Sequence, residues 1–372
     1  GATRGMRCAG DVLETTGLSG VTLYDPGALT LVAGAGTTLT EVENLLEKEG
    51  QRLAFEPRRL NRLQGTSGET TLGGIVATNS AGPARIALGN CADHLLGVRF
   101  VNGAGEIVKN GGRVMKNVTG YDLCKLVAGS YGTLAVCTSF TFKVLPKPEK
   151  MRTILIYGQE ANAAVLTLRD AMSSVHEVAA AAYLPANIAK RAGVDFVSDQ
   201  DLAVTAILID GAAPSVEFRN TALRGMFAGH GAIEELHGMR SDAFWTFVAN
   251  AGAFVQDQTT SVWRVSLPPS EAAGYIDRLH PELDELEYYL DWAGGLVWLS
   301  VPALTDGAGA DIIRAELKEK GHATLIRGAD AIRSSVPVFQ PQNPVIQKIS
   351  EKIREGFDPE RILNPGRMYP VA

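Results

Sequence analysis

The chain has 372 residues, 45% hydrophobic and 20% charged, and this length suits a globular protein of two domains. Its 35 basic and 41 acidic residues give a net charge of −6, which argues against nucleic acid or an anionic membrane surface as the main partner. No apolar run reaches the roughly 18 residues of a membrane span. The four cysteines form no CxxC pair, so we expect a cytoplasmic chain with reduced thiols, no metal site and no iron–sulfur cluster of its own.

The first clear helix is predicted for residues 39–50, LTEVENLLEKEG. Thr40 and Glu43 form a capping-box pattern at its start, and Gly50 ends it. The preceding VAGAGTTL has Leu39 in place of the third glycine of the dinucleotide fingerprint, so a tight turn between strand and helix is expected there. No GKS or GKT is present, which excludes a P-loop.

Residues 65–82, GTSGETTLGGIVATNSAG, contain five glycines. Two interpretations are open: a mobile surface loop, or a cradle whose backbone lies against a ligand. The cradle is favoured, because this run also carries apolar residues that a solvated loop would avoid. Adjacent Gly73 and Gly74 permit close approach of a flat or anionic group to the backbone. Hydrogen bonds to such a group are available from Thr71, Thr78, Asn79 and Ser80.

Residues 111–136 form a second unusual stretch, GGRVMKNVTGYDLCKLVAGSYGTLAV. A strand–helix–strand passage explains its glycines. It does not explain four polar residues in an otherwise apolar segment, which we expect to form a local network: Lys116, Asn117, Tyr121 and Asp122. Whether this network serves the fold or a ligand stays open.

Beyond a proline-flanked joint at residues 143–150, KVLPKPEK, predicted strands alternate with helices. This alternation predicts a sheet with helices packed on one face. The strands are expected at 152–158, 201–210, 261–267, 296–302 and 322–328. The helices are expected at 162–175, 215–228, 241–255 and 310–321. A final helix opens at Asn343-Pro344, closes around Gly356 and carries an apolar face of Ile346, Ile349, Ile353 and Phe357.

Several motifs together carry a family resemblance: TLGGIVATNSAG, GRVMKNVTGYDL, FKVLPKP and FDPERILNPGRMY. The chain resembles flavin-binding oxidoreductases of the vanillyl-alcohol oxidase type, and within them the E subunits of bacterial glycolate oxidase. The resemblance implies an α+β fold. Its FAD-binding domain of two subdomains spans residues 1–148, a second domain with an antiparallel sheet spans 149–335, and residues 336–372 return to the first domain.

The resemblance implies non-covalent FAD along the glycine-rich run. By position, the cofactor contacts are Thr71, Leu72, Gly73, Gly74, Thr78, Asn79 and Ser80, joined by Pro57, Gly132, Val136, Asn364 and Arg367. The family's first pyrophosphate loop matches Gly1, Ala2, Thr3 and Arg4, and the strand and helix expected before it are absent from this sequence.

No catalytic residue is assigned. Relatives that oxidise 2-hydroxy acids themselves carry an HxGDGNxH-like segment, which this sequence lacks. Oxidation of such an acid needs a base for the hydroxyl proton and a cation for the carboxylate. The local basic groups are His230, His237 and Arg240, and they are weak candidates because no metal-ligand spacing is present.

The function implied by the resemblance is that of the FAD-binding subunit of glycolate oxidase. Its partners are the D subunit, where glycolate is expected to be oxidised to glyoxylate, and the iron–sulfur F subunit, which passes electrons on. The complex is expected in the cytoplasm, with peripheral attachment to the inner face of the membrane allowed. Two alternatives stay open: a complex-building subunit with a degenerate flavin site, and a self-sufficient FAD-dependent 2-hydroxy-acid dehydrogenase.

Overall fold

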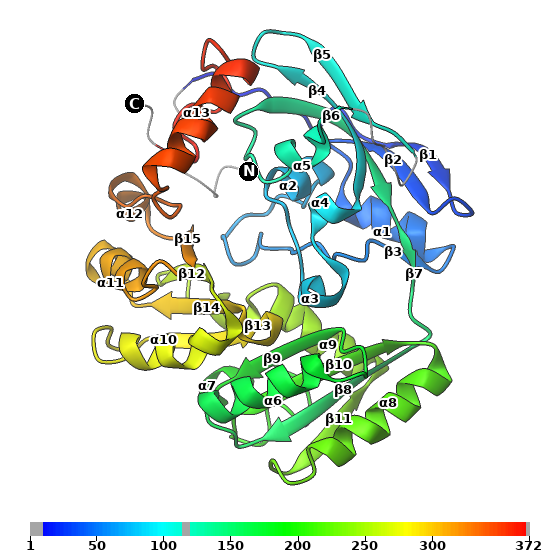
Figure 1. Cartoon of the computed structure of the whole chain (residues 1–372), viewed down its shortest axis with the longest axis vertical. Coiled ribbons are helices and arrows are strands. Elements are labelled where there is room, and N and C mark those ends of the chain that lie inside the picture. The colour runs from blue at the N-terminus through cyan, green and yellow to red at the C-terminus, as the bar shows by residue number, and fades with distance from the viewer. Residues whose placement is uncertain (1–9, 114–119, 370–372) are drawn as a thin grey trace.

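The computed structural model describes residues 10–113 and 120–369, and two β-sheets organise this part of the chain (Figure 1). Every strand pair in the described ranges is antiparallel. Helices follow and cover both sheets. The α+β class predicted from the sequence is therefore confirmed.

The first sheet lies in the upper half of Figure 1. Across the described residues its strand order is β1 (Val21–Asp25), β2 (Thr30–Gly34), β6 (Ala135–Lys143), β4 (Leu95–Asn102) and β5 (Ile107–Gly111). The helices of this half are α1 (Leu39–Glu47), α2 (Leu72–Ala77), α3 (Arg85–Leu88), α4 (Cys91–His94) and α5 (Leu123–Val127). Apolar side chains of α1, α2 and the sheet share one buried core, which holds α2 firmly in place.

The second sheet lies below the first in Figure 1. Its order in the described chain is β11 (Ile233–His237), β8 (Lys150–Tyr157), β10 (Val204–Gly211), β9 (Ala180–Leu184), β13 (Glu287–Asp291), β14 (Leu296–Val301), β12 (Ser261–Ser266) and β15 (His322–Arg327). A short ladder of β3 (Gln51–Arg52) and β7 (Leu145–Pro146) stands where the chain passes from the first half to the second.

Helices cover both faces of the second sheet, so the expectation of one covered face is wrong. They are α6 (Ala161–Ser173), α7 (Ala186–Ala189), α8 (Ala213–Met226), α9 (Gly238–Ala249), α10 (Ala272–Leu279), α11 (Ala310–Ala315) and α12 (Asp330–Ser335). In β8, Ile154 belongs to the core under α6, α8 and α10, whereas Leu155 belongs to the core under α7 and α9. Consecutive strand residues point to opposite faces, and both faces of β8 are apolar.

All five strands predicted for the second half form, but three others were missed: β9, β11 and β13. Strand β9 reads AAAYL, and all five of its residues are buried. Alanine is a poor strand former, so local preference gives no signal there. Burial between two neighbouring strands decides its conformation instead.

The start of α1 also differs from the prediction. The N-cap is Thr38, whose Oγ1 accepts a hydrogen bond from the Glu41 N–H at 3.2 Å, and the predicted cap Thr40 lies inside the helix. Position 38 is where the chain leaves the extended conformation, with φ −74° and ψ 149°. A threonine at either position fits the capping pattern, and the backbone turn selects the earlier one.

Helix α13 (Pro344–Phe357) begins after Asn343 and ends near Gly356 as predicted. Its apolar stripe faces outward: Ile346 is 52% exposed and Ile349 is 51% exposed. Arg354 is the buried side chain of α13. The helix lies beside the β4–β5 hairpin of the first sheet (Figure 1). No helix in the described ranges is long and apolar enough to cross a membrane.

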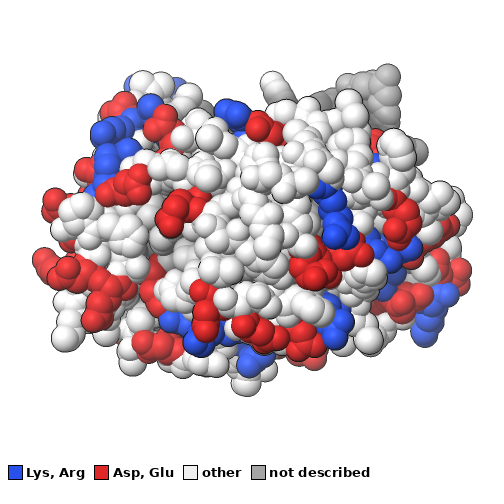
Figure 2. Space-filling view, turned by 90° about the horizontal axis from the view of Figure 1, so that it is seen from below, with Lys and Arg blue, Asp and Glu red and all other residues white. Residues whose placement is uncertain are grey.

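The face seen from below in Figure 2 carries interspersed acidic and basic side chains around a largely uncharged centre. This face belongs to the second sheet and its outer helices, which form the lower half of Figure 1. Neither sign dominates it, so the small negative net charge is not gathered into one patch there.

Candidate functional site

The glycine-rich run folds into helix α2 and the turns around it. Thr71 caps this helix by accepting a hydrogen bond from the Gly74 N–H. The Gly73 N–H donates to the Ala35 carbonyl at 2.7 Å, and a Cβ added at Gly73 would lie 3.0 Å from that oxygen. Among the residues that the structure describes, a Cβ added at Gly74 would meet only the Thr71 Oγ1, at 3.7 Å. Gly73 is therefore held against the protein, whereas the described residues leave space beside Gly74.

The polar residues of this run brace the turn itself. Thr78 Oγ1 donates to the Gly74 carbonyl at 2.8 Å. Asn79, at φ +45°, accepts from the Ala92 N–H at 3.0 Å through its Oδ1. Ser80 Oγ accepts from the Arg58 N–H at 3.0 Å. These bonds fix the shape of the backbone around the open space.

Three of the remaining predicted contacts fall on different elements. Leu72 is fully buried in the core, so only its backbone borders the run. Pro57 is buried next to Arg58. Val136 lies in β6, opposite Val101 of β4. Pro57 lies next to the glycine-rich run, because the N–H of its neighbour Arg58 donates to Ser80 Oγ.

Gly132 and Asn364 meet although they are more than 200 residues apart in the chain. The Asn364 Nδ2 donates to the Gly132 carbonyl at 2.9 Å. Gly132 has φ +71°, and a Cβ there would lie 2.7 Å from the Asn364 amide nitrogen. Glycine is thus required for both the backbone angle and the close approach. Arg367 lies one turn further on, and its N–H donates to the Asn364 carbonyl at 3.1 Å.

The C-terminal segment is anchored on the first sheet by Asp358. This side chain is fully buried and accepts hydrogen bonds from the N–H groups of Ile362 at 3.0 Å and Leu363 at 2.8 Å. The Gly103 N–H, at the turn between β4 and β5, donates to the Phe357 carbonyl at 2.7 Å. These contacts turn the chain after α13 so that Asn364 reaches Gly132.

Some predicted residues cannot be placed. Gly1, Ala2, Thr3, Arg4, Lys116 and Asn117 lie outside the described residues. Tyr121 is 89% exposed, so it takes no part in a buried network, contrary to the prediction. Asp122 has a local role instead, because its Oδ1 accepts from the Lys125 N–H at 3.1 Å and caps α5.

A buried ion pair joins the two halves of the molecule directly behind the glycine-rich run. Arg58 Nη2 donates to Asp291 Oδ2 at 2.9 Å, and both side chains are at most 2% exposed. The same guanidinium donates to the carbonyls of Ala81 and, at 2.6 Å, Ala249. Burial raises the pKa of Asp291, and Arg58 together with the Trp292 N–H offsets part of that rise. No local sequence pattern predicts this pair, since its members are 233 residues apart.

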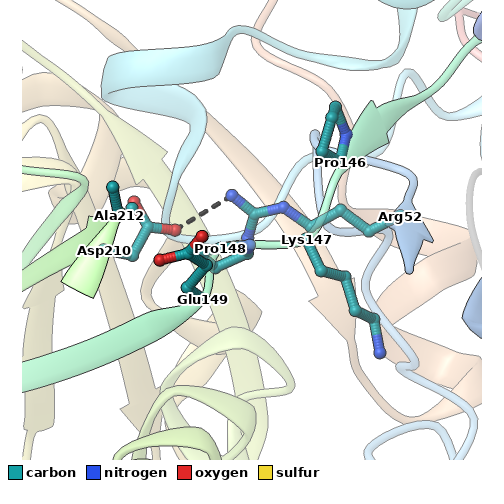
Figure 3. A pocket seen from close by; sticks show the side chains of 8 residues that line it. Arg52, Pro146, Lys147, Pro148, Glu149, Asp210 and Ala212 are labelled. Atoms are coloured by element: carbon teal, nitrogen blue, oxygen red, sulfur yellow. Dashed lines mark hydrogen bonds and ion pairs between the residues drawn. The ribbon is translucent and has the colours of Figure 1, made fainter.

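A cavity of about 320 Å³ lies at the joint between the halves, away from the glycine-rich run (Figure 3). Arg52 of β3 extends across it toward Asp210 of β10, and their Nη2 and Oδ2 atoms are 2.9 Å apart. Lys147 and Glu149 line the same cavity. Opposite charges therefore face one another across this cavity, and it is a polar joint with no predicted cofactor contact in its lining.

His94 is a buried histidine at the end of α4. It is 5% exposed, its Nε2 lies 2.7 Å from the Leu88 carbonyl oxygen, and its ring packs against Phe55 at 5.5 Å. The Nδ1 atom is buried without a hydrogen-bond partner. Burial is the main cause that lowers the pKa of His94. A neutral ring with its proton on Nε2 satisfies the single bond that it makes.

The weak catalytic candidates lie elsewhere. His237 pairs with Glu235 on β11, the edge of the second sheet opposite β15. Arg240 pairs with the exposed Asp195 at 3.0 Å, and His230 is exposed against Phe227. Within the described ranges no group of three or more His, Cys, Asp or Glu side chains is arranged to hold a metal ion.

Comparisons with known proteins identify the family of this chain. A family model described as an FAD binding domain matches residues 2–111. The chain is 33% identical over 366 residues to glycolate oxidase subunit GlcE of Escherichia coli K12, covering 98% of this chain and 89% of that protein. The chain belongs to the GlcE family. Its cofactor is FAD, and it is an FAD-dependent oxidoreductase, as the resemblance implied.

Two further matches bear on the GlcE fold. Glycolate oxidase subunit GlcD of Bacillus subtilis strain 168 is 25% identical over 329 residues, covering 81% of this chain and 68% of that protein. The solved p-cresol methylhydroxylase superposes with a TM-score of 0.68 at 17% identity, covering 95% of this chain and 79% of the other. The latter likeness shows the fold alone, and it confirms the predicted vanillyl-alcohol oxidase type.

Proposed function

We propose that this GlcE-family chain is the FAD-binding subunit of a glycolate oxidase complex that oxidises glycolate to glyoxylate. The observation that carries the proposal is the 33% identity to GlcE along 98% of the chain, combined with the open, backbone-lined face at Gly74. The partners are a D subunit and an iron–sulfur F subunit that takes electrons onward. The similarity to GlcD supports a related flavoprotein as one partner.

The FAD-binding domain spans residues 1–148, the second domain residues 149–335, and residues 336–372 return to the first domain. The bonds of Phe357 to Gly103 and of Asn364 to Gly132 support that return. FAD is held non-covalently along residues 71–74 and 78–80 and closed in by Asn364. Bound FAD supplies the two-electron acceptor, and the chain's own residues shape the cradle and keep the backbone fixed.

The complex works in the cytoplasm. Cys91, Cys124 and Cys137 are free thiols in the described residues, which suits a reducing compartment. Burial raises the pKa of all three, so they stay protonated and serve as small apolar side chains.

The test begins with the visible absorption spectrum of the purified chain after addition of FAD and gel filtration. Retained flavin absorption supports the proposal. Release of the flavin from the protein by acid denaturation shows that the binding is non-covalent. Asn364→Ala should weaken retention because the amide bridge to Gly132 is lost. Wild-type protein without retained flavin would contradict the proposal and favour a complex-building subunit with a degenerate site.

Turnover is then measured as glycolate-dependent dye reduction by the FAD-loaded chain, alone and with the D and F subunits. We expect slow reduction by the lone chain and restored turnover in the mixture. Equal rates would contradict the division of labour among subunits and favour a self-sufficient dehydrogenase.

A further inference from the structure

Two basic residues stand on one face of the second sheet, on neighbouring strands. Arg264 of β12 is paired with Thr324 of β15, and Ser266 with His322. Arg264 and His322 are thus diagonal neighbours on the same face. Further along the same two strands that face carries Val262 and Ile326, whose core also includes residues 60 and 63 of the first half. Arg264 and His322 therefore face the FAD-binding half.

A third basic residue, Arg85, comes from the FAD-binding half. Arg85 begins α3, five residues after Ser80, and its guanidinium lies over the Trp292 ring at 4.4 Å from the centroid. The Trp292 Nε1 donates to the Gly82 carbonyl at 2.9 Å. The indole thus fixes Arg85 at the end of the glycine-rich run and against the second sheet.

The charges of the three groups act on one another. The pKa of His322 is lowered, first by desolvation and then by the positive charges of Arg264 and Arg85. The side chain is nevertheless exposed to solvent at the start of β15. His322 is therefore neutral near pH 7 and stands beside two guanidinium groups.

The strand β15 also approaches the other end of the cradle. The Ala323 N–H donates to the Gln340 Oε1 at 3.3 Å, and the adjacent Phe339 packs edge-on against Tyr131 at 4.8 Å. Tyr131 directly precedes Gly132, where Asn364 is bound. Phe339 and Ala323 belong to the core on the face opposite to Ile326, so this contact brings the Gly132 end of the cradle to the same strand as His322.

We propose that Arg85, Arg264 and His322 form a binding site for the carboxylate of a small 2-hydroxy acid or its 2-oxo product. Guanidinium groups bind a carboxylate through paired charge-assisted hydrogen bonds. The neutral imidazole then accepts a hydrogen bond from the hydroxyl group of the acid. This site deepens the proposed function and rests on it, because glycolate is an acid of this class.

The first test titrates FAD-loaded protein with oxalate, a two-carbon acid with no hydrogen on carbon to transfer, and follows tryptophan fluorescence and calorimetric heat. Arg85→Gln and Arg264→Gln should each raise the dissociation constant about tenfold or more, the loss typical of a charged hydrogen-bond partner. Arg240→Gln, near the opposite edge of the second sheet at β11, is the matched control and should leave it unchanged. Equal dissociation constants in all four proteins would overturn the site.

The second test follows the His322 ring by NMR as the pH is varied, with His322→Asn to assign the resonance and His230→Asn as control. The pKa should lie below 6.5 in the free protein, rise in Arg85→Gln and Arg264→Gln, and rise in wild type on addition of oxalate. A His322 pKa that does not respond to oxalate would overturn the site. The flavin spectrum reports the proposed function separately, so FAD retention without an oxalate response rejects the site alone, and an oxalate response without FAD rejects the flavin role alone.

Discussion

Two neighbouring regions of this GlcE-family protein differ in packing: one is filled by side chains of the chain, and the other has space beside a glycine. At the junction behind the glycine-rich run, Arg58 and Asp291 are fully enclosed, and the guanidinium also bonds two carbonyl groups. At the cradle itself, a few residues away, Gly74 faces open space. The chain fills the first region with its own side chains and keeps the second clear.

The difference shows where each region finds its partners. Burying a charged group is costly unless a partner accompanies it, and at the junction the partner is another part of the same chain. At the cradle the polar side chains satisfy backbone groups, and we propose that FAD lies against the half-buried backbone at Gly74. Mutations at the junction should therefore change folding stability, and those at the cradle should change cofactor binding.

The largest effect is expected for Asp291→Ala. It leaves Arg58 buried without its carboxylate, which should lower the free energy of unfolding by about 3–5 kcal/mol. Asp195→Ala is the control, because its pair with Arg240 is largely exposed and should contribute less than about 1 kcal/mol. Urea unfolding followed by tryptophan fluorescence measures both. Similar losses in the two variants would remove the contrast between junction and surface.

An intermediate effect is expected from alanine at the two adjacent glycines. Gly73→Ala places a methyl group 3.0 Å from the Ala35 carbonyl oxygen and should lower the free energy of unfolding by about 1–3 kcal/mol. Gly74→Ala has room and lies in a helix, so stability should stay equal or rise by up to about 1 kcal/mol.

Gly74→Leu tests the space beside Gly74 with a larger side chain. It should leave the thermal midpoint of the cofactor-free protein nearly unchanged and abolish FAD retention in gel filtration, because the larger side chain enters the open space. Normal FAD retention by a folded Gly74→Leu protein would show that the open face is not the cradle.

The smallest effect is the pH dependence of folding stability caused by His94, which is buried at the end of α4. Its folded-state pKa is lowered, so the neutral ring is favoured in the folded protein. The stability that it contributes is present above the ordinary histidine pKa of about 6.5 and is lost as pH falls through the lower folded-state value. His94→Gln should flatten this decline in urea unfolding measured between pH 7.5 and 5. An unchanged slope would show that other groups cause the acid loss.

The sequence by itself determined much of the fold, because local patterns carry it. Short apolar runs rich in β-branched and aromatic residues marked all five predicted strands of the second half, and Asn343-Pro344 marked the start of α13. The adjacent glycines at 73 and 74 predicted a backbone-lined cradle, which stays a prediction; of the two, Gly73 packs against Ala35 and Gly74 has space beside it among the described residues. The motif resemblance indicated FAD, and the family match confirms it.

Only the tertiary structure decided the remainder. Strand β9 forms from alanines because neighbouring strands bury it, and the apolar stripe of α13 points outward although its spacing suits a core. Arg58 meets Asp291 across 233 residues, and Arg264 meets His322 through the register of β12 and β15. Such pairs leave no local pattern, because a single sequence carries the spacing of residues along the chain and the fold sets their spacing in three dimensions.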